Sequence, residues 1–411
     1  MIATSHITPK TQHYLELEER YGAHNYHPLP VVLSRGQGVF VWDVDDKRYY
    51  DFLSAYSAVN QGHCHPRIIA ALTEQAQKLT LTSRAFHAQL LGEYETYITQ
   101  YFGYDKVLPM NSGVEAVETA LKLARKWAYE VKGIETNKAK IVVAGQNFHG
   151  RTLNVISFST DAQARHNFGP FTPGYDIVPY NDLAALQTAL EDKNVAAFLV
   201  EPIQGEAGVM VPDDGYLKKA AEMCAAARVL FIADEIQTGL ARTGKMLACD
   251  YEDVRPDILI LGKALSGGVL PVSAVLADDE IMLTIKPGEH GSTYGGNPLA
   301  CRVAMEALQV LKDENMAEQA MVLGERLRQG LRDLNHPQVA LVRGKGLLNA
   351  IVIDHTNKDA AWDLCLAMKE RGLLAKPTHG DKIRLAPPLV ITAGHIDECV
   401  AIINEALKAT F

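Results

Sequence analysis

Short apolar runs alternate with amphipathic helical patterns through the middle of the chain. Seven of them have the length and the leucine or β-branched content of buried strands: residues 106–110, 140–144, 175–179, 195–200, 229–233, 257–261 and 271–276. Strands that alternate with helices form βαβ units, in which a parallel sheet lies between helical layers. The pattern therefore predicts an α/β fold with a large domain built on a mostly parallel seven-stranded sheet between helices.

The two ends of the chain have a different pattern. Residues 38–52 alternate apolar and polar positions around a turn at 45–47, which predicts a β-hairpin outside the large sheet. The C-terminal part predicts helices at 299–311, 318–334, 359–371 and 395–408, with a strand at 347–353. We expect these two ends to form a smaller α+β domain, with segments 1–50 and 298–411 flanking a large domain at 51–297.

Composition narrows the possible partners. The chain has 411 residues, 47% of them hydrophobic, and a formal net charge of -9. This length can bury a large core, whereas the acidic balance disfavours nucleic acid and anionic membrane, since both attract basic surfaces. No apolar stretch reaches the ~20 residues that span a bilayer. A small-molecule enzyme fits best.

The cysteines and the first residues predict a compartment. Six cysteines are scattered without a CxxC pair, as in cytosolic proteins with reduced thiols. Residues 1–10 lack the apolar core of a signal peptide and the arginine-rich character of a mitochondrial leader. We therefore expect a cytoplasmic protein. A His63-Cys64-His65 cluster has no further ligands near it in the sequence, so we expect no metal.

Asp234 and Lys263 each follow a predicted buried strand. Both should leave the carboxyl edge of the sheet, where open α/β sheets bind ligands. A lysine there can form a Schiff base with a carbonyl cofactor, and a buried carboxylate can keep a ring nitrogen protonated. The pair suggests pyridoxal 5′-phosphate, although an aspartate in this position could also be a helix N-cap.

Ser112 and Glu115 have the spacing of a capping box at the start of an amphipathic helix. With Gly113 between them, a phosphate could approach the free N–H groups at the positive end of that helix. An ordinary capped helix explains the same residues. The preceding strand and the Asp234/Lys263 pair favour the phosphate site.

Six sequence motifs occur in the order found in one enzyme family. They are residues 111–116 (NSGVEA), 148–152 (FHGRT), 201–206 (EPIQGE), 234–239 (DEIQTG), 262–268 (GKALSGG) and 290–298 (HGSTYGGNP). The chain resembles the class III aminotransferases of the fold type I pyridoxal phosphate enzymes, from about residue 26 to residue 386. Within that family it is most similar to the members that act on ornithine.

The resemblance implies roles around the cofactor ring. Lys263 would carry the Schiff base and later move the proton, and Asp234 would pair with the ring nitrogen. Gln237 would reach the phenolic oxygen, while Phe148 and Ile236 would cover the two ring faces. These five residues would hold and activate pyridoxal 5′-phosphate.

The resemblance also implies a shared phosphate site. Ser112, Gly113 and Val114 would bind the phosphate, and Ser292 and Thr293 would reach the phosphate of the neighbouring subunit. The enzyme would then be a homodimer with shared active sites, possibly in a higher oligomer.

For the substrates, the resemblance implies transfer of the ornithine δ-amino group to 2-oxoglutarate through a two-half-reaction exchange, in proline and arginine metabolism. Arg384 would bind the α-carboxylate of glutamate and would be masked by Glu206 for ornithine. Arg151 would hold the distal carboxylate, Tyr26 would touch the ornithine α-amino group, and Tyr56 would tune the choice of donor. Taken singly, these residues could equally be a structural ion pair and half-buried aromatics.

Three alternatives remain open at this point. Another class III enzyme could prefer acetylornithine, lysine or 4-aminobutyrate as donor. An isomerase similar to glutamate-1-semialdehyde aminomutase would need no 2-oxoglutarate. A non-catalytic scaffold could keep the fold, although the intact Lys263, Asp234 and Arg151 speak against it.

Overall fold

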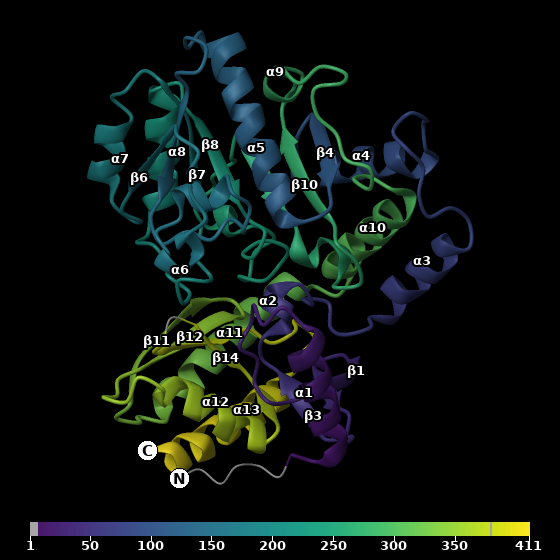
Figure 1. The fold of residues 1–411 in the computed structure, drawn as a ribbon, viewed down its shortest axis with the longest axis vertical. Helices are drawn as coiled ribbons and strands as arrows, with labels where there is room; N and C mark the ends of the chain where they lie inside the picture. Colours follow the sequence, from purple (N-terminus) through teal and green to yellow (C-terminus); the bar gives the residue numbers. More distant parts are fainter. Residues whose placement is uncertain (1–6, 379) are drawn as a thin grey trace.

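A seven-stranded sheet forms the centre of the larger of two bodies in the computed structural model, which describes residues 7–378 and 380–411 (Figure 1). Its strand order is β4-β10-β9-β8-β7-β5-β6. The strands are β4 (Lys106–Met110), β5 (Lys140–Ala144), β6 (Tyr175–Val178), β7 (Val195–Val200), β8 (Leu230–Asp234), β9 (Ile258–Leu261) and β10 (Ser273–Ala277). Within this sheet β10 runs antiparallel to both of its neighbours, β4 and β9, and the other neighbouring strands pair in parallel. The predicted sheet is confirmed: three strands match the predicted bounds, and the ends of the other four differ by at most two residues.

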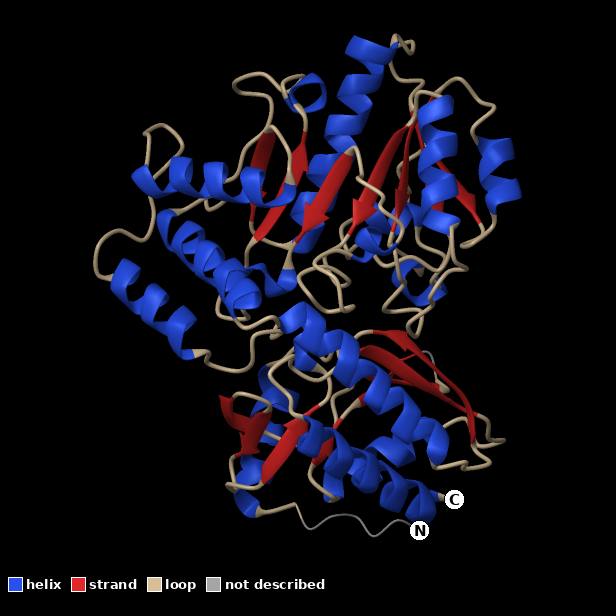
Figure 2. Cartoon of the chain, turned by 180° about the vertical axis from the view of Figure 1, so that it is seen from behind, coloured by secondary structure: helices blue, strands red, loops and turns tan. Residues whose placement is uncertain are grey.

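Helices cover both faces of this sheet (Figure 2). One face packs against α5 (Gly113–Trp127) and α9 (Asp279–Met282), and the other against α7 (Leu183–Ala189) and α8 (Tyr216–Ala226). Along β7, Phe198 joins the core on the α8 side and Leu199 the core on the α5 side, and both are fully buried. Burial on both faces explains why these strands are continuous apolar runs.

A further helical layer lies beside β4, β9 and β10. It consists of α3 (Pro66–Ala76), α4 (Gln89–Phe102) and α10 (Pro298–Asp313), with α10 packed on the other two. Pro66 is the first residue of α3, a position that suits proline because its missing N–H would have no partner within the helix. A short helix, α6 (Ala162–Arg165), packs on the 3-10 turn at Val155–Phe158, which itself contacts β6. In the part of the chain that the structure describes, no helix has both the length and the apolar character needed to cross a membrane.

The smaller body contains two four-stranded sheets, β1-β2-β3-β13 and β11-β12-β15-β14. Their strands are β1 (Leu33–Gln37), β2 (Phe40–Asp43), β3 (Arg48–Asp51), β11 (Val339–Lys345), β12 (Leu348–Ile353), β13 (Leu373–Leu374), β14 (Lys376–Thr378) and β15 (Lys382–Leu385). The predicted hairpin is β2 with β3. Because β13 pairs in parallel with β3, the two ends of the chain do fold together.

Four helices complete the smaller body, as Figure 1 shows: α1 (Pro9–Tyr21), α11 (Met316–Asp333), α12 (Ala360–Glu370) and α13 (Ala393–Thr410). The C-terminal three were predicted within a few residues, whereas α1 was not. A short turn, α2 (Ser54–Ser57), lies where the two bodies meet (Figure 1). The domain boundaries at 50/51 and 297/298 stay predictions.

Candidate active site

Asp234 is the last residue of β8 and is 4% exposed. His149 Nδ1 donates a hydrogen bond to Asp234 Oδ2 at 2.6 Å, and the Ile236 N–H donates to Oδ1 at 3.1 Å. Burial alone would lower the pKa of His149, but the hydrogen bond and the negative charge of Asp234 raise it overall. The chain after Asp234 turns without forming a helix, so the N-cap interpretation is wrong. Asp234 is a buried acceptor at the strand edge.

Lys263 leaves the same edge of the sheet as Asp234. β8 and β9 are parallel neighbours with Asp234 opposite Ile260, and Lys263 begins a single 3-10 turn just after β9. Burial lowers the pKa of Lys263, although the charges of Glu206 and Asp234 act in the opposite direction. A lysine with a lowered pKa is the kind of amine that can react with a carbonyl group.

Two glycines leave space for the Ile236 side chain between Asp234 and the start of α5. A Cβ on Gly113 would lie 3.0 Å from Ile236 Cδ1, and one on Gly262 would lie 3.3 Å from the same side chain. The predicted capping box at the start of α5 is confirmed: the Ser112 N–H donates to Glu115 Oε2 at 2.6 Å, and the Glu115 N–H donates to Ser112 Oγ at 3.3 Å. The remaining N–H groups of this first turn have no partner within the helix and can bind an anion.

Arg384 is buried at the junction of the two bodies. It lies in β15 and is 2% exposed; its Nη1 donates to Glu206 Oε1 at 2.6 Å and to Gln237 Oε1 at 2.9 Å. Gln237 Nε2 in turn donates to Glu206 Oε1 at 3.2 Å. The Arg384 Cζ lies 4.9 Å from the centre of the Tyr56 ring. Arg384 is thus neutralised by a carboxylate and covered by an aromatic ring.

The pKa shifts in this cluster follow from that arrangement. Burial would raise the pKa of Glu206, but the charge and hydrogen bond of Arg384 lower it overall. Burial raises the pKa of Tyr56, and the nearby Glu206 adds to this effect. Arg384 Nε is buried and has no hydrogen-bond partner among the described residues. Part of the guanidinium therefore stays available for another anion.

The other predicted substrate residues lie at the rim. Arg151 is exposed, and its Cζ lies 5.4 Å from the centre of the Phe148 ring. Tyr26 is 72% exposed in the loop after α1. A Cβ on Gly150 would clash with Val114 at 2.4 Å, so the loop that carries Phe148 and Arg151 packs on the first turn of α5.

Ser292 and Thr293 lie in the loop between α9 and α10. Ser292 Oγ accepts a hydrogen bond from Asn111 Nδ2 of the same chain at 2.9 Å, just before α5. Thr293 is exposed. The structure thus places this loop near the start of α5, and which subunit's phosphate it serves stays a prediction.

Two further residues belong to the site and were not predicted. His149 pairs with Asp234, and Glu201 Oε1 accepts a hydrogen bond from the Phe148 N–H at 2.8 Å. Glu201 is 5% exposed, and burial raises its pKa to about 7. Glu201 directly follows β7. The argument that selected Asp234, a polar residue at the end of a buried run, could have found it.

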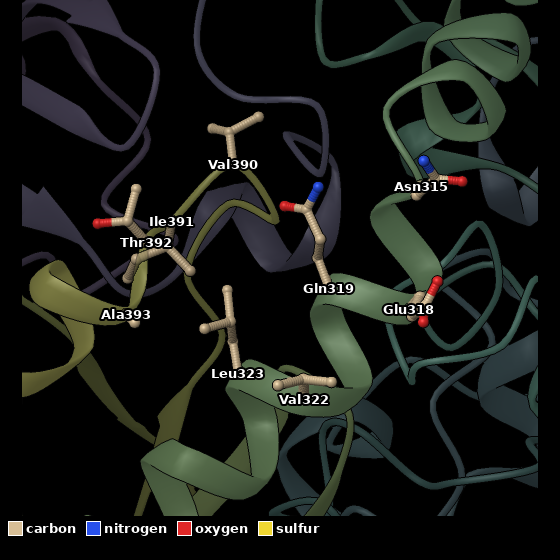
Figure 3. Close-up of a pocket in the computed structure, with 9 residues that line it drawn as sticks. All are labelled: Asn315, Glu318, Gln319, Val322, Leu323, Val390, Ile391, Thr392 and Ala393. Atoms are coloured by element: carbon tan, nitrogen blue, oxygen red, sulfur yellow. The ribbon is translucent and has the colours of Figure 1, made fainter.

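A surface groove of about 440 Å³ lies away from this cluster, between α11 and the segment before α13 (Figure 3). Its lining residues are Asn315, Glu318, Gln319, Val322, Leu323, Val390, Ile391, Thr392 and Ala393. None of the predicted site residues takes part in it. The chemistry of this molecule therefore belongs to the sheet edge, where the lysine, the carboxylates and the arginine converge.

Comparison with known proteins agrees with this geometry. Residues 21–407 match the model of the family Aminotransferase class-III. The chain belongs to this family. Class-III aminotransferases use pyridoxal 5′-phosphate, so the chain is a pyridoxal phosphate-dependent transaminase.

Several class-III relatives match nearly the whole chain. It is 64% identical over 399 residues to the mitochondrial ornithine aminotransferase of Rattus norvegicus. The matched residues make up 97% of this chain and 91% of the relative. An ornithine aminotransferase of Emericella nidulans is 56% identical over 417 residues, with coverages of 98% and 92%.

Solved structures of class-III relatives have the same fold. An ornithine aminotransferase from Toxoplasma gondii ME49 has a TM-score of 0.95 at 50% identity, covering 97% of this chain and 95% of that one. An acetylornithine aminotransferase from Elizabethkingia anophelis has a TM-score of 0.91 at 63% identity, with coverages of 98% and 100%.

The residues of this class-III chain fit the cofactor. A half-buried lysine and a buried carboxylate share one sheet edge, and a capped helix N-terminus begins beside them at a glycine. A Cβ on Gly205 would come within 2.0 Å of Gln237 Oε1, so Gly205 leaves this amide the space it occupies. The lysine, the carboxylate and the helix N-terminus suit the carbonyl, the ring nitrogen and the phosphate of the cofactor, respectively.

Proposed function

We propose that this aminotransferase transfers the δ-amino group of L-ornithine to 2-oxoglutarate, giving L-glutamate 5-semialdehyde and L-glutamate in two half-reactions. The observation that carries the proposal is the contact between Arg384 and Glu206 at 2.6 Å. The curated relatives that are 56–64% identical to this chain and are named ornithine aminotransferase support the same substrate.

The masked arginine suits two different donors. The δ-carbon of ornithine is a plain methylene carbon, so no carboxylate needs a cation beside it. Glutamate instead brings its α-carboxylate to this place, and a permanently free Arg384 would favour that reaction. Glu206 neutralises Arg384 for ornithine and releases it for glutamate or 2-oxoglutarate. The unpartnered Nε of Arg384 supports this second state.

The rest of the substrate extends towards the rim. Arg151 is exposed and carries a planar fork of donors, which suits a bidentate contact with the distal carboxylate of 2-oxoglutarate. Tyr26 contacts the α-amino group of ornithine, and Tyr56 limits the space beside Arg384. These residues set the distance between the reacting carbon and the far charges of each substrate.

The catalytic groups act on protons. When bound, pyridoxal phosphate supplies a carbonyl carbon that accepts an amino group and a ring that takes up the electrons released when a proton leaves the substrate. Asp234 keeps the ring nitrogen protonated, and His149 holds the Asp234 carboxylate in place. Gln237 hydrogen-bonds the phenolic oxygen, while Phe148 and Ile236 cover the two ring faces.

Lys263 has two tasks in this proposal. Its Nζ would hold the cofactor covalently, and as a free amine it would act as the base that takes the proton from the substrate carbon. Its lowered pKa favours the neutral amine that such a base requires. Ser112, Gly113 and Val114 bind the phosphate at the start of α5.

A donor panel tests the substrate assignment. The purified enzyme with 2-oxoglutarate should turn over ornithine faster than acetylornithine, lysine or 4-aminobutyrate, and trapping should give the δ-semialdehyde. A higher rate with any other donor would overturn the ornithine assignment. Borohydride reduction followed by peptide mapping should label Lys263, and turnover without 2-oxoglutarate would indicate an isomerase.

Acetylornithine is the second candidate donor. The Elizabethkingia anophelis structure, which is 63% identical to this chain, is an acetylornithine aminotransferase. The two donors differ at the α-nitrogen, which is a cation in ornithine and a neutral amide in acetylornithine. Replacing the Tyr26 hydroxyl in Tyr26→Phe should therefore reduce kcat/KM for ornithine and leave acetylornithine nearly unchanged, if ornithine is the substrate.

A homodimer with shared sites is part of the proposal. Large apolar side chains that are exposed in the single chain support it: Phe86 is 73% exposed, Leu153 65% and Tyr294, next to Thr293, 58%. Light scattering should give twice the chain mass. A hybrid of Lys263→Ala and Thr293→Val subunits should keep one site with normal cofactor affinity if Thr293 acts in the partner's site, and none if it acts in its own.

We also propose a cytoplasmic location. The six cysteines are free, and five of them are buried, which suits a reducing compartment. Several relatives carry the word mitochondrial in their names. Fractionation of the source cells separates the two locations.

A further inference from the structure

The turn that carries Tyr56 is strained. Ser54, Ala55, Tyr56 and Ser57 have φ angles of 48°, 46°, 62° and 71°, so four successive residues with side chains lie in the left-handed region. L-amino acids avoid this region because Cβ approaches the following carbonyl oxygen, and they visit it as single residues rather than in runs. Such strain persists where the surroundings hold it, and it concentrates at functional sites.

The same turn buries two hydroxyl groups at a cost. Ser54 and Ser57 are 0% and 1% exposed, and their Oγ atoms have no hydrogen-bond partner among the described residues. Burying an unpaired hydroxyl is unfavourable. The turn is thus unfavourable both in its backbone and in its polar groups, and something outside it must hold it.

Asp51 is the group that holds the turn. Its Oδ1 accepts hydrogen bonds from the N–H groups of Leu53 at 2.9 Å and of Ser54 at 2.8 Å. Its Oδ2 lies 2.7 Å from His63 Nε2. Asp51 itself is the last residue of β3 and is buried, so the anchor belongs to a sheet rather than to a loop.

The conformation of the turn determines where the Tyr56 ring lies. Within the turn the Tyr56 N–H donates to the Leu53 carbonyl at 3.0 Å, and the ring lies 4.9 Å from Arg384 Cζ. A right-handed turn of the same four residues would project this side chain in a different direction. The backbone therefore decides whether the ring covers the arginine.

We propose that Asp51 and His63 are positioning residues that keep the Ser54–Ser57 turn left-handed and so place the Tyr56 ring beside Arg384 to select the amine donor. The inference rests on the proposed function, since donor choice at Arg384 is part of it. Neither residue touches the substrate. Each acts through Tyr56.

A double-mutant cycle tests the route through Tyr56. Asp51→Asn should lower the ratio of kcat/KM for ornithine over that for 4-aminobutyrate by about tenfold, and it should do so less than about twofold in a Tyr56→Ala background. An equal effect in both backgrounds, or an unchanged ratio in Asp51→Asn, would overturn the inference. His63→Gln is a milder variant for the case that Asp51→Asn does not fold, and its expected change is about threefold in the same direction.

A matched control is available in a second carboxylate–imidazole pair. His65 Nε2 lies 3.0 Å from Glu314 Oε1, and this pair carries no hydrogen bond to the Ser54–Ser57 turn among the described residues. Glu314→Gln should leave the donor ratio unchanged. A shift as large as that of Asp51→Asn would mean that loss of any carboxylate–imidazole contact alters donor choice, which would contradict the inference. A wild-type enzyme that does not use ornithine would instead overturn the proposed function, and donor selection with it.

The strain itself has a readout that does not depend on activity. Glycine adopts a left-handed conformation without steric cost, and Ala55 is exposed. In the cofactor-free protein, Ala55→Gly should relieve backbone strain and Ser57→Ala should remove an unpaired buried hydroxyl, so each should raise the thermal midpoint by about 1–2 °C. A lower midpoint in both variants would show that neither feature is unfavourable and would overturn the premise.

Discussion

Glu206 Oε1 and Arg384 Nη1 lie 2.6 Å apart, although Glu206 follows β7 in the larger body and Arg384 lies in β15 of the smaller one. A second contact strengthens this junction, since Thr378 Oγ1 of β14 donates to the Glu206 carbonyl at 2.8 Å. The loop after β7 is therefore part of both bodies. The charge of the substrate site therefore depends on how the larger and the smaller body meet.

Replacing Glu206 should change which substrate is preferred. Glu206→Gln keeps an oxygen beside Arg384 but removes the negative charge, so the arginine should attract an α-carboxylate more strongly. We expect the ratio of single-turnover rates for glutamate over ornithine to rise about tenfold. Cofactor absorbance after mixing with each donor measures it. Asp381→Asn, which loses a more exposed contact with Lys382 in the same region, should leave the ratio unchanged.

Replacing His149 should weaken cofactor binding. Asp234 would lose its buried partner, and removing one member of a buried charged pair costs about 3–5 kcal/mol. His149→Asn should therefore raise the Kd for pyridoxal phosphate at least tenfold, measured by fluorescence titration of the cofactor-free protein. An unchanged Kd would mean that the hydrogen bond from His149 to Asp234 does not contribute to cofactor binding.

Glu201 should make stability depend on pH. Its pKa in the folded protein is about 7, mainly because it is buried, against an ordinary value of 4.5. The folded state thus binds the extra proton, and its stability falls as pH rises from about 4.5 to about 7. Glu201→Gln cannot ionise, so it should be more stable than the parent by about 3 kcal/mol at pH 8 and nearly equal at pH 4. Urea unfolding of the cofactor-free proteins tests the sign.

Arg242 should hold the two bodies together. It is 0% exposed, and its guanidinium donates to Asn60 Oδ1 at 2.6 Å, to the Leu347 carbonyl at 3.0 Å and to the Pro387 carbonyl at 2.6 Å. Burial lowers its pKa to about 9. Arg242→Met fills the space without donors and leaves these acceptors unpaired, so we expect a loss of about 3 kcal/mol in urea unfolding. An unchanged midpoint would contradict a bridging role.

Gly205 should be intolerant of a single added methyl group. A Cβ there would lie 2.0 Å from Gln237 Oε1, so Gly205→Ala should displace Gln237 from Arg384 and lower kcat/KM at least tenfold. Gly92 is the matched control, because a Cβ at this position in α4 meets nothing within 4 Å. Gly92→Ala should keep full activity and gain about 0.5–1 kcal/mol of stability. Steady-state rates and thermal unfolding separate the two.

The central sheet could be predicted because its signal is local. Each strand of the large body is a short run that is buried on both faces, so its own residues reveal it. β13 has two residues and pairs with β3 far away in the chain, whereas β1 is largely exposed and no residue of β11 is buried. Such strands form because another strand pairs with them, and the hydrophobic pattern of their own residues does not reveal that strand. The polar helix α1 was missed for a similar reason, since it buries little of its surface.

The sequence by itself determined the sheet, its ligand-binding edge and the placement of Asp234 and Lys263 there, because strand direction and the positions of strand ends follow from local patterns. The tertiary structure decided the pairs between distant segments. His149 meets Asp234 across 85 residues of sequence, and Glu206 meets Arg384 across 178. It also decided the left-handed turn under Tyr56. Four side-chain-bearing residues adopt that conformation because packing and the Asp51 hydrogen bonds outweigh their local preference, and no local pattern encodes such a balance.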